Sequence, residues 1–375
     1  LFAYFTGNNI SQEAIRFALS NDGLVYKALN NDQPIIASSA ISNTGGVRDP
    51  HILRGEDGMY YMVVTDMVSA NGWNSNRGMV LLKSNDLVNW SSAKVHIPTA
   101  FPSQFSNVDR VWAPQTIYDK TTGKYLIYFS MRKGSGDYDK IYYAYANSSF
   151  TALETVPAQM FYHPDNQTCI DGDIVEKDGL YHMFFKTEGS GNGIKKAVSN
   201  KLTEGWTLLD RYLDQNSNAV EGGCVFRLYN TDTWILMYDV YSSGYYEFTS
   251  STDLENFSVM SGNSFDFSPR HGTVIPITAA EKAALNNKWG ETTQAPQISQ
   301  ENEKPLWSLQ ANGIVLQNPE HIQKAEVFDI FGRKLLESKH PESKIAFHFG
   351  KSELYILKIT TQSGKIYTDK ILSTF

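Results

Sequence analysis

The sequence predicts an all-β protein, a five-bladed β-propeller followed by a small C-terminal β-sandwich module. Three observations predict this fold: a short phrase that recurs five times, strand-like segments after the recurrences, and a change of character near Gly290. The phrase reads RDPH from Arg48, VWAP from Val111, IDGD from Ile170, VEGG from Val220 and RHGT from Arg270. The second residues of these openings lie 63, 59, 50 and 50 residues apart. Propeller blades repeat at roughly 40–50 residues before insertions, so each opening is expected to begin one blade.

Strand-like segments follow each of the first four openings. In these segments apolar residues alternate with polar ones, Tyr, Phe, Val and Ile are frequent, and Gly and Asp stand at the ends. This pattern predicts half-buried antiparallel strands. The predicted first and second strands are 51–53 and 59–65, 115–118 and 124–131, 173–175 and 180–186, and 224–228 and 233–240. Third strands are predicted at 80–85, 142–147, 195–200 and 247–252.

The fifth blade is expected to combine the two ends of this region. Residues 15–20 resemble a third strand, yet no opening phrase precedes them. The missing inner strand is at 271–277, and we expect it to pair beside residues 2–5. Such pairing leaves no open sheet edge of the kind that promotes aggregation.

A polar stretch separates the propeller from the rest of the chain. Residues 291–305 read ETTQAPQISQENEKP, a composition typical of a linker. We therefore predict a propeller domain at 1–290, a linker at 291–305 and a β-sandwich module at 306–375. Strands are expected in the module at 325–331, 344–349, 354–361 and 365–372.

Composition excludes several classes of function. The net charge is −7 and the basic residues are scattered, which argues against a nucleic-acid groove. No run of about 18 apolar residues predicts a membrane span. The two cysteines, Cys169 and Cys224, have no zinc-site spacing, and we expect free thiols rather than a disulfide. Nothing in the sequence indicates an organic cofactor or an oligomeric state.

The ordered set RDPHI, VWAPQ, IDGDI, VEGGCVF and RHGTV resembles glycoside hydrolase family 43, over roughly residues 1–280. Enzymes of this family are five-bladed β-propellers that act on arabinose- and xylose-containing plant polysaccharides. The resemblance implies that Asp49 is the general base, that Glu221 is the general acid, and that Asp171 orients and tunes that acid. The chain departs from the common pattern by having Gly172 and Gly223 where proline is frequent.

Inverting hydrolysis needs an acid and a base whose carboxyl groups are about 6.5–9.5 Å apart, so that water fits between. The order of the blades makes Asp49 and Glu221 the wider pair. A carboxylate about 5 Å from Glu221 would oppose its ionisation by roughly 3 kcal/mol at an effective dielectric near 20. We therefore expect Asp171 to keep Glu221 protonated.

Other site residues follow from the openings and from one insertion. Trp112, Trp73, Arg110 and Arg48 are expected to contact the substrate, with packing at the rim as the alternative. The resemblance also implies a structural calcium or other hydrated cation near His271. A neutral histidine bonded to backbone is the alternative for His271.

The C-terminal segment resembles the sorting modules of proteins secreted by Bacteroidetes. The similarity lies in VFDIFGRKLLE and YILKITTQSGKIYTDKIL. It implies a secreted, periplasmic or cell-surface protein. The chain opens directly on strand-like sequence without a signal peptide, as a processed exported protein or a trimmed one would.

The expected function is an inverting glycosidase, exo-acting or debranching, with a carbohydrate as its partner. An α-L-arabinofuranosidase is the first candidate and a β-D-xylosidase the second. A retaining fructan-type furanosidase would normally show an Asn-Asp-Pro motif one blade earlier, where Asn8-Asn9 lacks the aspartate. A non-catalytic carbohydrate-binding propeller would not need an acid and a base across a gap.

Overall fold

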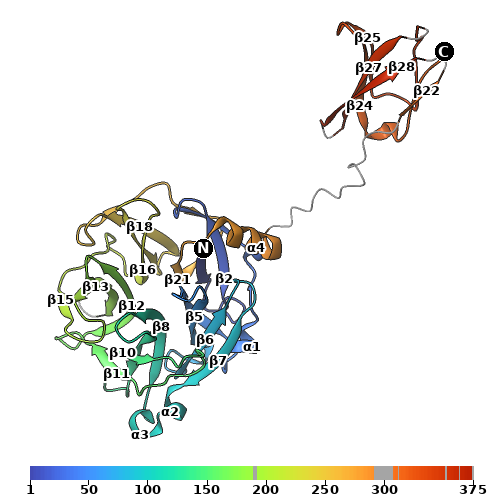
Figure 1. Cartoon of the computed structure of the whole chain (residues 1–375). Helices are drawn as coiled ribbons and strands as arrows, with labels where there is room; N and C mark the ends of the chain where they lie inside the picture. The colour runs from blue at the N-terminus through green and yellow to red at the C-terminus, as the bar shows by residue number, and fades with distance from the viewer. Residues whose placement is uncertain (189–191, 291–306, 311, 351–352, 363, 374–375) are drawn as a thin grey trace. The chain divides into compact units, whose positions relative to one another are not determined.

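The computed structural model describes residues 1–188, 192–290, 307–310, 312–350, 353–362 and 364–373. About half of the described residues lie in β-strands and only a small share lies in helices, which confirms the all-β prediction. Contacts between Cα atoms divide the chain into two units, Leu1–Thr292 and Thr293–Phe375 (Figure 1). The predicted linker, 291–305, lies outside the described residues. No helix in the described ranges is long and apolar enough to cross a membrane.

The described part of the first unit contains five sheets, and in each the strand that opens a repeat lies innermost. The first sheet is β4 (Val47–Arg54), β5 (Tyr60–Asp66), β6 (Gly78–Ser84) and β7 (Ser91–His96). The second is β8 (Arg110–Asp119), β9 (Lys124–Arg132), β10 (Lys140–Tyr145) and β11 (Ala158–Phe161). The third is β12 (Thr168–Lys177), β13 (Leu180–Glu188), β14 (Gly193–Ser199) and β15 (Thr207–Leu209). The fourth is β16 (Glu221–Arg227), β17 (Trp234–Val240), β18 (Tyr245–Ser251) and β19 (Ser258–Val259). The fifth is β21 (Arg270–Val274), β1 (Phe2–Phe5), β2 (Arg16–Ser20), β3 (Val25–Ala28) and β20 (Ser264–Phe265).

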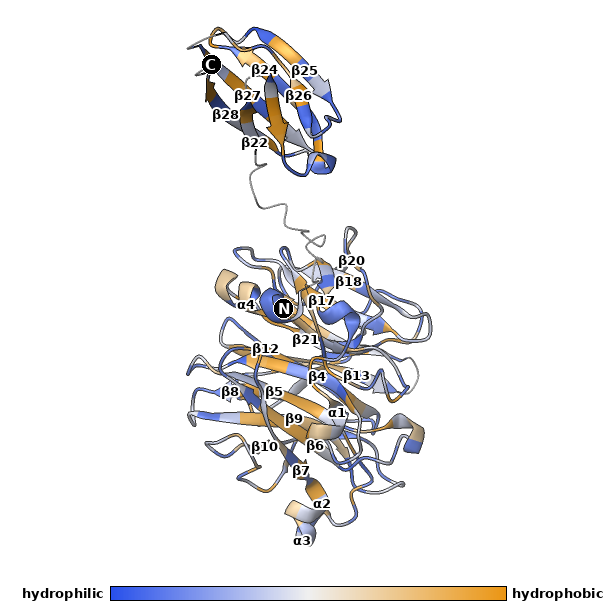
Figure 2. Cartoon of the chain, turned by 90° about the vertical axis from the view of Figure 1, so that its right-hand side faces the viewer, coloured by the Kyte–Doolittle hydropathy of each residue, from blue (hydrophilic) through white to orange (hydrophobic). Residues whose placement is uncertain are grey.

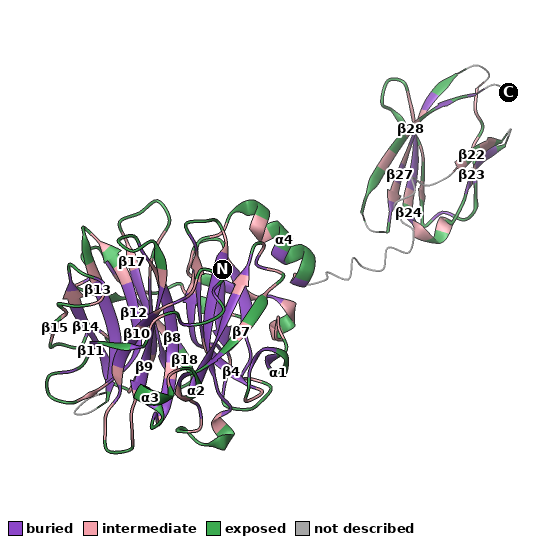
Figure 3. Cartoon of the chain, turned by 60° about the horizontal axis from the view of Figure 1, so that its bottom comes forward, coloured by how far each residue is buried: buried purple, intermediate pink, exposed green. Residues whose placement is uncertain are grey.

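The five innermost strands form a closed ring. Strand β4 contacts β8, and the contacts continue through β12, β16 and β21 back to β4. Because β21 pairs antiparallel with β1, the fifth sheet joins the two ends of this region, as the sequence predicts. Hydrophobic residues concentrate on the strands and hydrophilic residues on the connecting loops (Figure 2). The strands are largely buried (Figure 3).

Apolar clusters fill the spaces between neighbouring sheets. One cluster, for example, joins Val63 and Leu81 of the first sheet to Ile127 and Phe129 of the second. Both cysteines, Cys169 and Cys224, are buried in such clusters and are free thiols, as expected.

A bulge interrupts the same place in each inner strand. The pairing register shifts between Arg48 and His51, Trp112 and Gln115, Ile170 and Asp173, and Glu221 and Cys224. Within each of these four bulges one residue has a left-handed backbone, with φ of 51° at Asp49, 43° at Ala113, 54° at Asp171 and 61° at Gly222. In β21 the shift falls between Arg270 and Gly272, at His271.

The bulges correct the alignment made from the sequence. Asp49, Asp171 and His271 do occupy equivalent positions, but Trp112 and Glu221 lie one residue before that position. The residue equivalent to Asp49 in the fourth sheet is Gly222. A Cβ atom there would lie 2.7 Å from Cβ of His271, so only glycine leaves room for the histidine.

Just past the bulges, side chains link neighbouring sheets. We call these contacts the inter-sheet belt, and they cover four of the five junctions. The backbone N–H of Thr116 donates to His51 (3.3 Å), that of Ile174 to Tyr128 (3.0 Å), that of Val225 to Asp173 (2.6 Å) and that of Ile52 to Thr273 (2.9 Å). The belt therefore fixes the register of one sheet against the next.

Short helices complete the first unit. They are α1 (Ser38–Ile41), α2 (Ile97–Ala100), α3 (Pro102–Phe105), α4 (Ala279–Trp289), and the 3₁₀ turns η1 (Asn30–Asp32) and η2 (Ser69–Asn71). Helix α4 was not predicted, although Thr278 and Glu281 form a capping box at its start. Arg54 of the first sheet binds both carboxylate oxygens of Glu281. This ion pair holds helix α4, which follows the fifth sheet in the chain, against the first sheet.

The second unit is also made of strands. One sheet is β22 (Trp307–Gln310), β23 (Gly313–Leu316) and β26 (Lys344–Ala346). The other is β25 (Lys334–Lys339), β24 (Ile322–Asp329), β27 (Leu354–Thr361) and β28 (Ile366–Leu372), and η3 (Pro319–His321) precedes β24. Residues of both sheets, including Ile314, Val327 and Leu357, share one apolar core. Strands β24, β26, β27 and β28 match the predicted segments, whereas β22, β23 and β25 were not predicted.

The pairing of β21 with β1 gives a stability prediction. A Cβ atom on Gly272 would overlap the carbonyl oxygen of Ala3 and lie 2.8 Å from Cα of Tyr4. Gly272→Ala should therefore displace β1 and destabilise the first unit by about 1–3 kcal/mol, measured by thermal unfolding. Gly134→Ala is the matched control, because a Cβ atom there meets nothing within 4 Å. Equal unfolding temperatures for the two variants would contradict this account of ring closure.

Candidate active site

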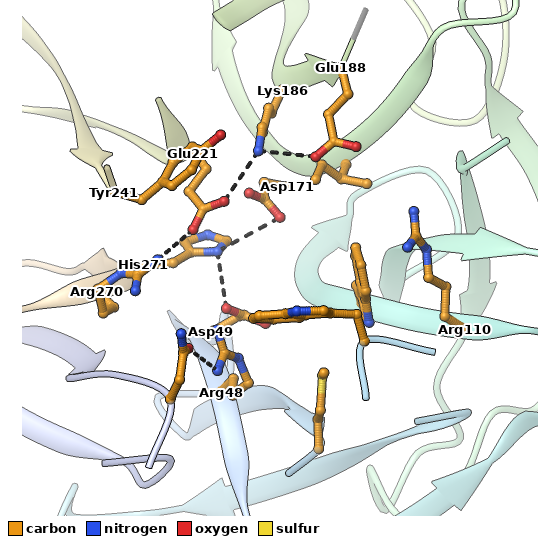
Figure 4. Close-up of a pocket in the computed structure, with 15 residues that line it drawn as sticks. Arg48, Asp49, Arg110, Asp171, Lys186, Glu188, Glu221, Tyr241, Arg270 and His271 are labelled. Atoms are coloured by element: carbon orange, nitrogen blue, oxygen red, sulfur yellow. Dashed lines mark hydrogen bonds and ion pairs between the residues drawn. The ribbon is translucent and has the colours of Figure 1, made fainter. Parts of the chain in front are cut away.

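A pocket of about 480 Å³ lies where the inner strands converge. All eight residues predicted for the site line it: Asp49, Asp171, Glu221, Trp112, Trp73, Arg110, Arg48 and His271. The acids come from three different sheets, on β4, β12 and β16, and β21 contributes the histidine (Figure 4). The structure thus brings together residues that are up to 223 positions apart in the sequence, from Arg48 to His271.

His271 lies between two of the acids. Its Nδ1 atom is 3.4 Å from Oδ1 of Asp49 and 3.9 Å from Oδ1 of Asp171. Burial alone would lower the pKa of His271, but the charge of Asp171 and the hydrogen bond and charge of Asp49 outweigh it and raise the pKa to about 9. The histidine is therefore a buried cation at neutral pH.

Asp49 is held as a carboxylate by its neighbours. The hydroxyl of Thr65 donates to Oδ2 of Asp49 at 2.7 Å, and the N–H of Ala113 donates to that hydroxyl at 2.8 Å. Burial alone would raise the pKa of Asp49, yet the hydrogen bond and charge of His271 hold it below its usual value. An ionised carboxylate can accept a proton, which is what a general base must do.

The pKa of Asp171 is shifted in the opposite direction. Its Oδ2 atom accepts a hydrogen bond from the N–H of Gly222 at 3.0 Å. Burial raises the pKa of Asp171 to about 6; the charge of His271 opposes this shift, and the charges of Glu221 and Asp49 add to it. Two buried acids of one pocket thus differ in their readiness to hold a proton.

Glu221 is bound by two cations. Nη2 of Arg270 donates to Oε1 at 2.6 Å, and Nζ of Lys186 donates to Oε2 at 3.2 Å. Arg270 is held in turn by Asp239, which pairs with Glu221 across β16 and β17. The Glu221 side chain is 25% exposed, so it remains open to the pocket.

Sequence reasoning gave no role to Lys186, Arg270 or Asp239. A signal for two of them was present: a lysine and an aspartate directly follow apolar and aromatic residues in two second strands, at FFKTE and LMYDV. In the strand register Lys186 lies opposite Ile170, and Asp239 lies opposite Glu221. Both partners stand near the start of an opening phrase. Charged residues at those register positions therefore face the same end of the ring as the acids.

Trp73 and Trp112 form an aromatic wall of the pocket. Their rings lie 6.4 Å apart at 80°. The Arg110 guanidinium lies 3.8 Å from the Trp112 ring and Arg48 lies 5.2 Å from the Trp73 ring. Both arginines are already paired: Arg110 binds Asp139, and Arg48 binds Glu13. Their guanidinium groups therefore support the wall, and Trp73, at 51% exposure, presents the open aromatic surface.

A cation near His271, as the resemblance implies, would need several ligands from neighbouring side chains or from water. Among the described residues no group of three or more His, Cys, Asp and Glu side chains could hold a metal ion. Nδ1 of His271 also faces two carboxylates, as a protonated nitrogen would. The residues therefore do not fit a cation bound directly by this nitrogen.

Comparison with known proteins agrees with this geometry. A family model for glycosyl hydrolase 43-related proteins, described as a probable glycosyl hydrolase domain, matches residues 1–283. The chain belongs to this family. Membership identifies residues 1–283 as a glycosyl hydrolase domain of this family.

Individual proteins that are similar to this chain share little sequence identity with it. An α-L-arabinofuranosidase of Bifidobacterium longum subsp. longum is 26% identical over 193 residues, which cover 46% of this chain. The chain spans only about a fifth of the length of that curated relative, since the match covers 18% of it. The GH43 BlXynB protein of Bacillus licheniformis is 14% identical with a TM-score of 0.51, covering 99% of this chain and 83% of that one. This likeness shows the fold. The α-L-arabinofuranosidase of Lactobacillus brevis is 15% identical with a TM-score of 0.48, covering 66% and 84% of the two chains.

Proposed function

We propose that the first unit is a five-bladed β-propeller that hydrolyses α-L-arabinofuranosides with inversion, acting at chain ends or branches. The observation that carries this proposal is that Asp49, Asp171 and Glu221, from three separate sheets, line one pocket. A pocket of about 480 Å³ suits a terminal sugar better than the middle of a polymer. The arabinofuranosidase name of the Bifidobacterium relative supports the choice of sugar.

The proposed roles follow from the charges. Asp49, held as a carboxylate by His271, takes a proton from the attacking water. Glu221 gives a proton to the leaving oxygen on the other face of the sugar. The exposed face of Trp73 receives the apolar side of a sugar ring. Asp171 lies next to both groups and orients the fourth sheet through its bond to the N–H of Gly222.

Domain organisation and location are part of the proposal. We assign catalysis to residues 1–290, a linker to 291–305 and a β-sandwich module to 306–375. The shared core of the two C-terminal sheets supports a sandwich. The resemblance of this module to secretion sorting modules supports export to the cell surface, periplasm or medium. Fractionation of the source cells, followed by antibody detection, tests it.

A substrate screen tests the function. We expect turnover of nitrophenyl α-L-arabinofuranoside to exceed that of nitrophenyl β-D-xyloside, and proton NMR to show the inverted anomer first. Faster turnover of the xyloside would favour the β-D-xylosidase. A retained anomer and cleavage of fructans would favour the fructan-type furanosidase. Sugar binding without turnover of any glycoside would favour the carbohydrate-binding propeller.

A further inference from the structure

Lys186 is a buried lysine whose charge is shared between two carboxylates. Its side chain is only 3% exposed, and its Nζ atom lies 3.2 Å from Oε2 of Glu221 and 3.3 Å from Oε1 of Glu188. The same atom lies 4.7 Å from the centre of the Tyr241 ring. Burial alone would lower the pKa of Lys186, but the charges of Glu221, Asp171 and Glu188 outweigh it and raise the pKa. Lys186 is therefore a fixed positive charge inside the pocket.

Lys186 and Arg270 hold Glu221 from opposite sides. Arg270 of β21 binds Oε1 and Lys186 of β13 binds Oε2, so each oxygen has its own cation. Each cation also has a second acid, since Asp239 binds Arg270 and Glu188 binds Lys186. The carboxyl group of Glu221 is thus fixed in direction by two sheets that are not its own.

The contact with Glu188 explains how Lys186 can remain in place during proton transfer. When Glu221 carries a proton, its attraction for Lys186 weakens, and Glu188 still neutralises the lysine. When the proton leaves, negative charge develops on Glu221 within hydrogen-bond reach of Lys186. An interaction that strengthens as charge develops stabilises the transition state more than the ground state.

We propose that Lys186 is a positioning residue for the acid step: it directs Glu221 toward the leaving oxygen and stabilises the carboxylate that forms there. In that step the O–H bond of Glu221 breaks and a bond from hydrogen to the leaving oxygen forms. The glycosidic C–O bond breaks with its electron pair on that oxygen, and water attacks the sugar carbon while Asp49 takes a proton from it. The inference rests on the proposed function, because it takes Glu221 as the acid.

Leaving groups of different basicity test this role. A dinitrophenolate leaves without help from an acid, whereas an alkoxide does not. Lys186→Met should lower kcat about tenfold or more on an alkyl α-L-arabinofuranoside, because a hydrogen bond to a charged group is lost. On the dinitrophenyl arabinofuranoside, kcat should stay within about twofold of the parent value, with KM unchanged on both substrates. Lys186→Arg should restore part of the alkyl-glycoside activity.

Two further variants distinguish the positioning role of Lys186 from an effect on folding and from a failure of the proposed function. Lys196→Met is the matched control, because Lys196 is equally buried and paired but binds Glu255 and the carbonyl of Leu254, outside the pocket. It should leave kcat unchanged on both substrates. Glu221→Gln should show the same leaving-group dependence as Lys186→Met, with a larger loss.

An equal loss on both substrates for Lys186→Met, or no loss on either, would overturn the positioning role. If Glu221→Gln still shows the leaving-group dependence in that case, the acid assignment stands and only the role of Lys186 fails. A Glu221→Gln variant without that dependence would instead refute the acid assignment, and the inference with it.

Discussion

Replacing Asp49 by Asn should lower kcat by about 10²–10⁴-fold on every glycoside that the parent enzyme hydrolyses, whatever the leaving group. The amide is nearly the same size as the carboxylate and can still accept the Thr65 hydroxyl, so the pocket should keep its shape. What the variant loses is the ability to take a proton from water. Attack by water is needed for good and poor leaving groups alike, so both should suffer equally.

Initial rates on dinitrophenyl and alkyl arabinofuranosides measure this effect. Asp178→Asn serves as the control, because Asp178 lies on the surface between β12 and β13 and shares the left-handed backbone of Asp49. The control should match the parent. An Asp49→Asn variant that loses activity on the alkyl glycoside alone would show that Asp49 assists the leaving group and is not the base.

Removing the His271 imidazole should destabilise the first unit by about 3–5 kcal/mol. His271→Ala leaves two buried carboxylates, Asp49 and Asp171, without the cation between them, and loss of one partner from a buried ion pair costs roughly this much. Urea unfolding at pH 6 measures the change. A loss below about 1 kcal/mol would show that the two acids do not depend on the histidine.

The same histidine predicts a pH dependence of stability. The pKa of His271 is raised from 6.5 to about 9 in the folded protein. Its contribution is therefore complete below pH 6.5 and is lost as the pH rises through 9, up to about 3 kcal/mol in total. The parent should lose stability between pH 6.5 and 9.5, and His271→Ala should lose clearly less over that range. Equal pH slopes for the two proteins would contradict the ion pair.

The sequence predicted the elements that repeat. The openings and the alternating strands located the inner strand of all five sheets, and all eight residues expected from the openings, their flanks and one insertion line one pocket. Repetition made this possible, because residues at equivalent places in two blades face the same end of the ring.

The repeating pattern could not predict the bulges. A residue pattern does not show that Asp49, Ala113, Asp171 and Gly222 share a left-handed backbone, since three different residue types occupy one position. The alignment by chemical similarity therefore placed Glu221 one residue from its true position. Partners across strands were hidden for a related reason: Lys186 and Asp239 meet the acids only through the register of each sheet.

Helix α4 could have been predicted from the sequence. The segment from Thr278 to Glu281 reads TAAE, which has the spacing of a capping box, and alanines and leucine follow. Strand β25 was missed because few of its side chains are buried, so its apolar alternation is weak.

The inter-sheet belt has a consequence for how the molecule unfolds. Each side chain in it accepts a backbone N–H from the neighbouring sheet, so no sheet can slide along the axis without leaving a buried donor unsatisfied. The five sheets should consequently melt together as one cooperative block. A truncated form that lacks any one of them would lose more than its own share of contacts, because at least one neighbouring sheet would lose the hydrogen bond that fixes its register.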